Sequence, residues 1–362
     1  MNRRLFLQSS AAAAAAQALP WSAAFGANDA WRGYEMTTTV EIVRPKGISR
    51  AWIPLPSVED NGWNQVLGNS WTGNTSRAEL ANDGKYGVQM LYAEWAAGVD
   101  RPVVQVTSRV RTRDRAIDLS KPGNAEDLSA ADRQFFTAPS ELIPTDGLVR
   151  ETALKITKGA GNDVEKGRAI YEWIVDNTFR DPKVRGCGIG DVKAMLESGN
   201  LGGKCADLNA LYVGLARSIG LPARDVYGIR VAKSEYGYKS LGAGSENVTK
   251  AQHCRCEFFA RGYGWVPVDP ADVRKVVLEE PPGQLKVDDP RVVAARKRLF
   301  GSWEMNWLAF NRGADVKLPH SSDDPKKVPF LMYVNAETGG ERLDQLDPDS
   351  LGYSITAWDL KA

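Results

Sequence analysis

The sequence predicts an α+β protein with an antiparallel β module in its first third, followed by a helix packed on an antiparallel sheet. Three observations support this prediction. Short runs between residues 31 and 120 alternate apolar and polar residues, a strongly periodic helix follows a double glycine, and a strand–turn–strand pattern spans residues 252–269.

The N-terminus has the pattern of a twin-arginine export signal over residues 1–27. Arg3 and Arg4 precede Phe6 and Leu7, an alanine run covers residues 11–16, and small residues suited to cleavage follow. The apolar run is too short to span a bilayer. We therefore expect a periplasmic protein with no stable membrane anchor after cleavage. The alternative is a retained alanine-rich helix.

Composition limits the partners of the protein. The 362 residues carry a formal net charge of +1, and loss of the two leader arginines leaves the chain close to neutral. No basic block stands out, so the sequence predicts no nucleic-acid partner. The remaining length is sufficient for two domains with their own cores.

The domain organisation follows from the pattern along the chain. Residues 28–150 alternate as in MTTTVEIV and PVVQVTSRV and then become polar and proline-broken, which predicts a β-sandwich-like domain with a linker. Residues 151–290 hold the predicted catalytic core. Residues 291–362 form a C-terminal extension that is expected to complete the core or the sheet.

The stretch GGKCADLNALYVGLARSIGLPAR places Cys205 at the head of an amphipathic helix that Gly220 and Pro222 end. Its apolar face consists of Leu208, Leu211, Tyr212, Leu215 and Ile219. A helix start carries unpaired N–H groups and a partial positive charge, which stabilise a thiolate, the reactive form of cysteine. The alternative is a buried thiol that acts as a small hydrophobe.

A hairpin is predicted downstream, with its turn at Gly262 and Gly264. The turn lies midway between His253 and Asp269, so these residues are expected nearly opposite each other on neighbouring strands. An aspartate in that position can orient an imidazole that exchanges a proton with a thiol. Each also has a simpler interpretation: His253 as a hydrogen-bonded strand residue, and Asp269 as a turn residue before Pro270.

Together, the cysteine helix, His253 with Glu257 on its strand, and YGWVPVDP ending in Asp269 resemble the transglutaminase-like superfamily. The resemblance implies a papain/transglutaminase-like core, in which the nucleophile begins a helix that packs on an antiparallel sheet. It implies Cys205 as nucleophile, His253 as general acid/base and Asp269 as the residue that orients it. The chain departs from the family where Cys254, Arg255 and Cys256 stand in place of an aromatic pair.

The implied activity is that of an exported cysteine enzyme that cleaves or transfers acyl groups of protein or peptide amides through a thioester. Hydrolysis is favoured over cross-linking because water is abundant and no amine pocket can be identified. Cell-wall peptide is among the candidate substrates. The alternative is a catalytically inactive binding module of the periplasm.

No cofactor and no metal are expected. Cys254 and Cys256 lie two apart on a strand and face away from His253, and no second histidine or CxxC pair accompanies them. Three questions stay open in the sequence. They are the second oxyanion donor, for which Tyr171 and Trp173 qualify only by chemistry, the role of Glu257, and whether residues 233–252 are a lid or a disordered insertion.

Overall fold

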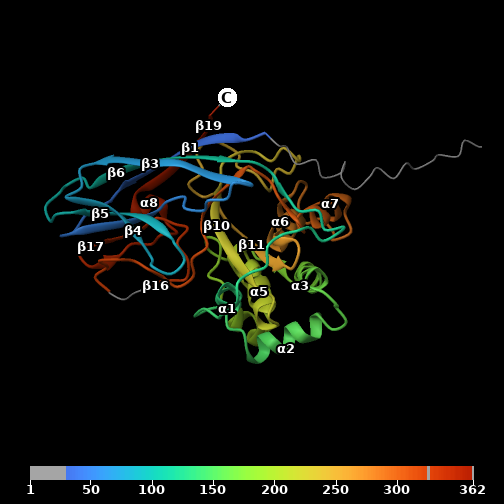
Figure 1. The fold of residues 1–362 in the computed structure, drawn as a ribbon. Coiled ribbons are helices and arrows are strands. Elements are labelled where there is room, and N and C mark those ends of the chain that lie inside the picture. The colour runs from blue at the N-terminus through green and yellow to red at the C-terminus, as the bar shows by residue number, and fades with distance from the viewer. Residues whose placement is uncertain (1–29, 324–326, 361–362) are drawn as a thin grey trace, which may run out of the picture.

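The computed structural model describes residues 30–323 and 327–360, so the predicted signal at residues 1–27 lies outside the described residues. No helix within these two ranges is long and apolar enough to cross a membrane. The chain folds into a β sandwich beside a mixed α/β part (Figure 1).

The sandwich has two antiparallel sheets, ordered β19-β1-β6-β3 and β18-β17-β2-β5-β4. Tyr34 and Met36 of the first sheet share one core with Ile53 and Leu91 of the second, so the apolar side of each alternating strand faces inward. The strands are β1 (Arg32–Glu41), β2 (Ser49–Pro54), β3 (Asn64–Gly73), β4 (Arg77–Asn82), β5 (Gln89–Trp95), β6 (Val103–Thr112), β17 (Asn335–Thr338), β18 (Glu341–Arg342) and β19 (Tyr353–Leu360). The predicted β-rich N-terminal region is confirmed.

The C-terminal segment returns to this sandwich. β19 pairs with β1 along the register Met36↔Ala357, and β17 pairs with β2 along Asn335↔Trp52. Each sheet therefore combines strands from the N-terminal and the C-terminal parts of the chain (Figure 1). The segment that forms the α/β part lies between these two groups of strands in the sequence.

The second part is built on an antiparallel sheet ordered β12-β11-β10-β14. Helix α5 (Cys205–Ser218) packs on β10 and β11, and α2, α3 and α6 surround it. These elements are β10 (Ala223–Arg230), β11 (Gln252–Ala260), β12 (Gly264–Val268), β14 (Trp307–Asn311), α2 (Gly147–Ile156), α3 (Asp163–Asn177) and α6 (Pro270–Glu279). The predicted helix on an antiparallel sheet is confirmed.

Helix α5 differs from the expected amphipathic helix. All of its 14 residues are buried, because helices cover the side that faces away from the sheet. Even Arg217 is enclosed, where its guanidinium donates to the carbonyl oxygens of Ala223 (2.8 Å) and Ala138 (3.0 Å).

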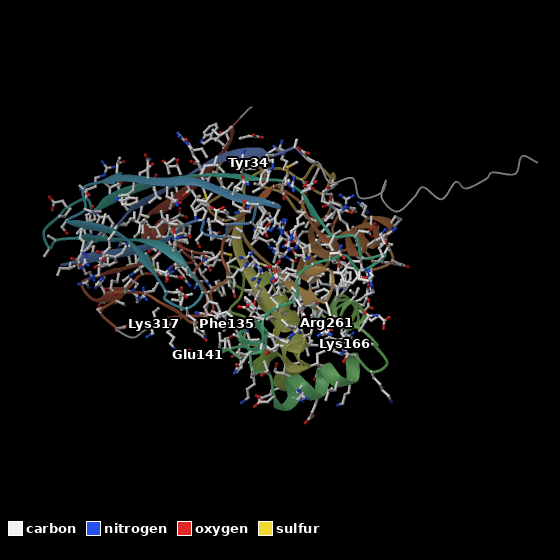
Figure 2. The ribbon with its side chains drawn as sticks, in the orientation of Figure 1. Tyr34, Phe135, Glu141, Lys166, Arg261 and Lys317 are labelled. Carbon is white, nitrogen blue, oxygen red and sulfur yellow. The ribbon has the colours of Figure 1, made fainter. Side chains whose placement is uncertain are left out.

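Shorter elements complete the fold. They are β7 (Arg115–Ala116), α1 (Ala130–Thr137), β8 (Phe179–Arg180), α4 (Val192–Ser198), β9 (Gly202–Gly203), α7 (Pro290–Arg298), β13 (Ser302–Trp303), β15 (Val316–Lys317), β16 (Lys327–Val328) and α8 (Pro348–Leu351). Helix α1, which carries Phe135 (labelled in Figure 2), bridges the parts. Phe135 packs on Tyr86 of the sandwich, while Phe136 packs on Trp265 of β12.

A buried charge cluster fixes the junction of the two parts. Glu257 of β11 has no exposed surface, and it accepts hydrogen bonds from Arg115 (2.5 Å) and Arg224 (2.6 Å), with Arg312 at 3.4 Å. These three guanidinium groups hold the pKa of the Glu257 carboxyl far below its usual range, although burial alone would raise it. Glu257 is therefore a structural residue behind the sheet.

We predict that Glu257→Ala lowers the free energy of unfolding by about 3–5 kcal/mol, because it leaves buried guanidinium groups without their counter-charge. Urea denaturation of the purified protein measures the change. Glu41→Ala is the control, since the Glu41–Arg101 pair is exposed and its loss should barely move the midpoint. Equal effects of the two substitutions would contradict the assigned role of Glu257.

Candidate active site

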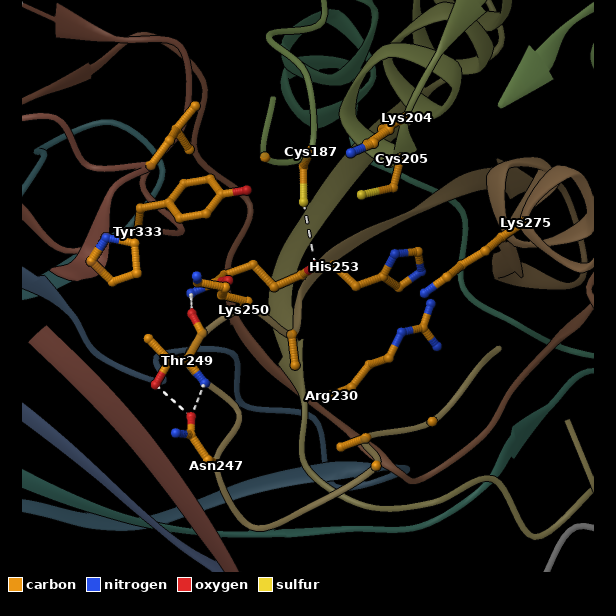
Figure 3. Close-up of a pocket in the computed structure, with 18 of the residues that line it drawn as sticks. Cys187, Lys204, Cys205, Arg230, Asn247, Thr249, Lys250, His253, Lys275 and Tyr333 are labelled. Carbon is orange, nitrogen blue, oxygen red and sulfur yellow. Dashed lines mark hydrogen bonds between the residues drawn. The ribbon is translucent and has the colours of Figure 1, made fainter. Parts of the chain in front are cut away.

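Cys205 is the first residue of α5, and its thiol opens into a cavity of about 510 Å³ (Figure 3). Close packing leaves little room for side chains at the double glycine before it. A Cβ on Gly202 would lie 2.3 Å from the Phe179 ring, and one on Gly203 would lie 2.5 Å from the Asp207 Cβ. The short parallel pairing of β9 with β8 thus brings the chain directly into the helix.

Asp207 fastens the loop before the cavity to the start of the helix. Its Oδ1 accepts from the backbone N–H groups of Ile189 and Gly190 (both 3.0 Å), and its Oδ2 accepts from that of Lys204 (2.9 Å). Gly188 has a φ of +85°, and a Cβ there would lie 1.9 Å from the Asp207 carboxylate. Asp207 is therefore both a carboxylate in the first turn of α5 and the residue that holds the preceding loop in place.

The loop brings Cys187 beside the nucleophile position. The Ala206 N–H donates to the Cys187 carbonyl oxygen (2.9 Å), and the Cys187 thiol donates to the Gln252 carbonyl oxygen (3.3 Å). Figure 3 shows the sulfur atoms of Cys187 and Cys205 on the same wall of the cavity.

His253 lies near the start of β11 and is 3% exposed. Its Nε2 lies 2.7 Å from Oδ2 of Asp269 and 3.4 Å from Oδ2 of Asp272. Because Nε2 is committed to carboxylates, Nδ1 is the ring nitrogen left to exchange a proton with Cys205.

The structure brings Cys205, His253 and Asp269 together, but Asp269 is not on a strand opposite His253. The hairpin pairs Cys256 with Val268, two residues beyond the partner expected from the glycines, and β12 ends at Val268. Asp269 is instead the N-cap of α6, where its Oδ1 accepts from the Asp272 N–H (3.0 Å). The two oxygens of one carboxylate thus cap a helix and hold the imidazole.

Sequence reasoning missed three residues around this carboxylate. Asp272 contacts His253 and accepts a hydrogen bond from Arg230 (2.6 Å), and Asn209 donates to the carbonyl oxygen of Cys254 (2.9 Å) and lies 3.4 Å from Asp269 Oδ1. Arg230 and Asn209 are both buried. A signal was present for two of them: Asp272 stands one turn after Asp269, and Asn209 one turn after Cys205.

The charges favour a thiolate–imidazolium pair. The neighbouring Cys187 and Cys254 thiols, and then His253, hold the pKa of the Cys205 thiol well below its usual value against the effect of burial. Burial and Arg230 lower the pKa of His253, but Asp272 and Asp269 outweigh them and raise it to about 9. These shifts favour the thiolate form of Cys205 and the protonated form of the His253 ring.

The loop at residues 233–252 is ordered and forms a wall of the cavity through Gly242, Asn247 and Thr249. The Glu280 carboxylate accepts from the backbone N–H groups of Lys239 (3.1 Å) and Ser240 (2.9 Å), which holds the loop against the end of α6. The disordered-insertion alternative is wrong.

Neither candidate oxyanion donor reaches the site. Tyr171 is fully buried and donates to the Arg296 carbonyl oxygen (2.9 Å), and neither it nor Trp173 lines the cavity. The cavity wall does hold one unpredicted hydroxyl, that of Tyr333, which points toward Cys187 (Figure 3).

The four cysteines are free thiols. As the strand geometry predicts, Cys254 and Cys256 belong to the apolar core under α5, while His253 faces the acidic pair. A metal could be held geometrically by His253, Asp269 and Asp272. Those carboxylates, however, already face the cations Arg230 and Arg255, which favours a charge-balanced cluster over a metal site.

We predict that His253 titrates near pH 9 and that Asp272→Asn lowers this pKa, because the negative charge of Asp272 helps to raise it. NMR of ring protons suits the measurement, since the chain has only two histidines. Glu79→Gln, beside His320, is the control that should leave the His253 titration unchanged. A His253 pKa near 6.5 would contradict the ion-pair assignment.

A second prediction concerns Asp207. Asp207→Asn replaces an acceptor oxygen with a donor, so at least one buried N–H loses its partner and the free energy of unfolding falls by about 1–3 kcal/mol. Asp349→Asn, at an exposed position, should leave stability unchanged. Differential scanning calorimetry compares the two variants, and equal stability would show that the loop does not depend on this carboxylate.

Comparison with known proteins agrees with this architecture. Residues 150–270 match the family described as the transglutaminase-like superfamily. A protein of Haemophilus influenzae, described as uncharacterized, is 37% identical over 344 residues and covers 90% of each chain. The crystal structure of a candidate cysteine protease from Cytophaga hutchinsonii superposes with a TM-score of 0.55 at 14% identity, covering 92% of each chain, which shows a shared fold.

The family match covers the cysteine helix, the histidine strand and the aspartate cap of α6. Through this core, the chain belongs to the transglutaminase-like superfamily.

Proposed function

We propose that this chain is an exported cysteine enzyme that hydrolyses amide bonds of proteins or peptides through a thioester on Cys205. The observation that carries the proposal is the buried Cys205–His253–Asp269 arrangement at the wall of an open cavity. The twin-arginine pattern of residues 1–27 supports action in the periplasm.

In the proposed reaction, the Cys205 thiolate attacks the amide carbonyl carbon and forms a tetrahedral intermediate. N–H groups at the start of α5 stabilise its oxyanion. The protonated Nδ1 of His253 then gives its proton to the leaving nitrogen, the C–N bond breaks, and a thioester and a free amine result.

Deacylation uses the same groups in reverse. Neutral His253 takes a proton from water, the resulting oxygen nucleophile attacks the thioester, and the carboxylic acid leaves as the Cys205 thiolate is restored. Asp269 keeps the ring oriented through both steps, because its Oδ2 holds Nε2 at 2.7 Å.

Charge in the cavity supports water as the acceptor. Its walls carry Arg180, Lys204, Arg230, Lys250 and Lys275. These cations repel the ammonium form of a lysine side chain or other primary amine, which a cross-linking enzyme has to admit. Water carries no charge and meets no such barrier.

A peptide library incubated in H₂¹⁸O with an added primary amine tests the proposal by mass spectrometry. We expect one ¹⁸O atom in each new carboxyl group, little amine adduct, and no product from Cys205→Ala. If amine adducts predominate, the enzyme transfers acyl groups to amines, and the proposal of hydrolysis is wrong.

The rival function is an inactive binding module, and the thiol itself distinguishes it. Iodoacetamide should alkylate Cys205 rapidly at mildly acidic pH, and His253→Ala should slow that reaction. A Cys205 that reacts no faster than a small free thiol, together with no cleavage, would favour the binding module.

A further inference from the structure

The cavity beside Cys205 is lined by five cations that come from separate elements. They are Arg180 of β8, Lys204 before α5, Arg230 of β10, Lys250 of the 233–252 loop and Lys275 of α6. No aspartate or glutamate from residues 30–323 or 327–360 lines it.

The acidic groups behind the wall are too few to neutralise these cations. Glu279 serves both Arg180 and Lys275, the latter at 3.6 Å. Lys250 has only a long, exposed contact of 3.9 Å with Asp349.

The acid paired with Arg230 is also shared, since Asp272 contacts His253 as well. Lys204 makes no ion pair with any residue that the structure describes. Positive charge therefore exceeds negative charge around the reacting sulfur.

Three of the cationic side chains have little contact with water. The side chains of Arg180, Arg230 and Lys275 are only 13%, 3% and 18% exposed. Electrostatic attraction between such groups and a bound anion is weakly screened, so it is much stronger than between surface charges. In Figure 3 the cationic ends of Arg230 and Lys275 meet beside the His253 ring, and Lys204 projects beside Cys205.

We propose that this cavity selects acidic peptides, in which a carboxylate beside the scissile amide is held by the surplus cations, chiefly Lys204 and Lys275. The inference rests on the proposed function, since it takes Cys205 as the reacting group. Carboxylates suit the site because ammonium groups bind them as point charges from several directions.

Two alkylating reagents of nearly equal size test the charge without knowledge of the substrate. Iodoacetate carries a carboxylate and iodoacetamide a neutral amide. In both reactions the thiolate forms a C–S bond, the C–I bond breaks and iodide leaves. We expect the iodoacetate-to-iodoacetamide rate ratio at Cys205 to exceed that of N-acetylcysteinamide by about tenfold or more, and to fall with added salt.

Variants locate the source of that preference. Lys204→Gln and Lys275→Gln should each lower the rate ratio severalfold, and Lys204→Arg should restore most of it. Lys193→Gln is the matched control, because Lys193 is 66% exposed on α4 and lies outside the cavity. A raised ratio that neither cavity variant lowers would overturn the proposal.

The same data separate failure of the inference from failure of the proposed function. Slow reaction with iodoacetamide means that the thiolate itself is absent, and the proposed function fails. Fast reaction with iodoacetamide but no preference for iodoacetate leaves the enzyme intact and overturns only the acidic-peptide assignment.

A peptide library then tests the substrate class directly. Half of the library is methyl-esterified, which makes every carboxylate neutral while it leaves the amide bonds unchanged. We expect cleavage sites enriched in Asp and Glu within about two residues of the cut bond, and loss of cleavage in the esterified half. Equal cleavage of both halves would refute the selection of carboxylates.

Discussion

The site depends on a single buried carboxylate, that of Asp269. Its Oδ1 caps α6 and its Oδ2 holds the ring of His253, so the helix and the imidazole cannot move independently. A buried carboxylate is costly unless it is paired and hydrogen-bonded, and both oxygens here meet that condition. Asp272 extends the arrangement to Arg230, which balances the second negative charge.

Much of the site could be predicted from the sequence because its signals are local. The periodicity of α5 and its head at Cys205 follow from one stretch of chain, and the hairpin that carries His253 follows from a second. The predicted pairing of the hairpin is two residues off, because two glycines mark a turn without fixing which residues oppose each other. The predicted closeness of His253 and Asp269 is nevertheless found, because Asp269 at the N-cap of α6 lies with its Oδ2 2.7 Å from the His253 ring.

Other features could not be predicted because they arise only when distant segments meet. Nothing in the residues of β17 or β19 indicates that they pair with β2 and β1, about 300 residues earlier in the chain. Complete burial of α5 depends on the helices that cover it, which come from separate segments of the chain. Arg230 resembles an ordinary strand residue until the fold places its guanidinium 2.6 Å from the Asp272 carboxylate.

The same charges bear on the direction of the proposed chemistry. Hydrolysis turns a neutral amide into a carboxylate, and the surplus of cations around Cys205 stabilises that product and the oxyanion before it. Transfer to an amine creates no new anion, and its acceptor has to lose a proton in a cavity that already disfavours cations. A thiolate that is stabilised by its neighbours is also a good leaving group, so the cavity that keeps Cys205 ionised should also favour release of the acid from the thioester.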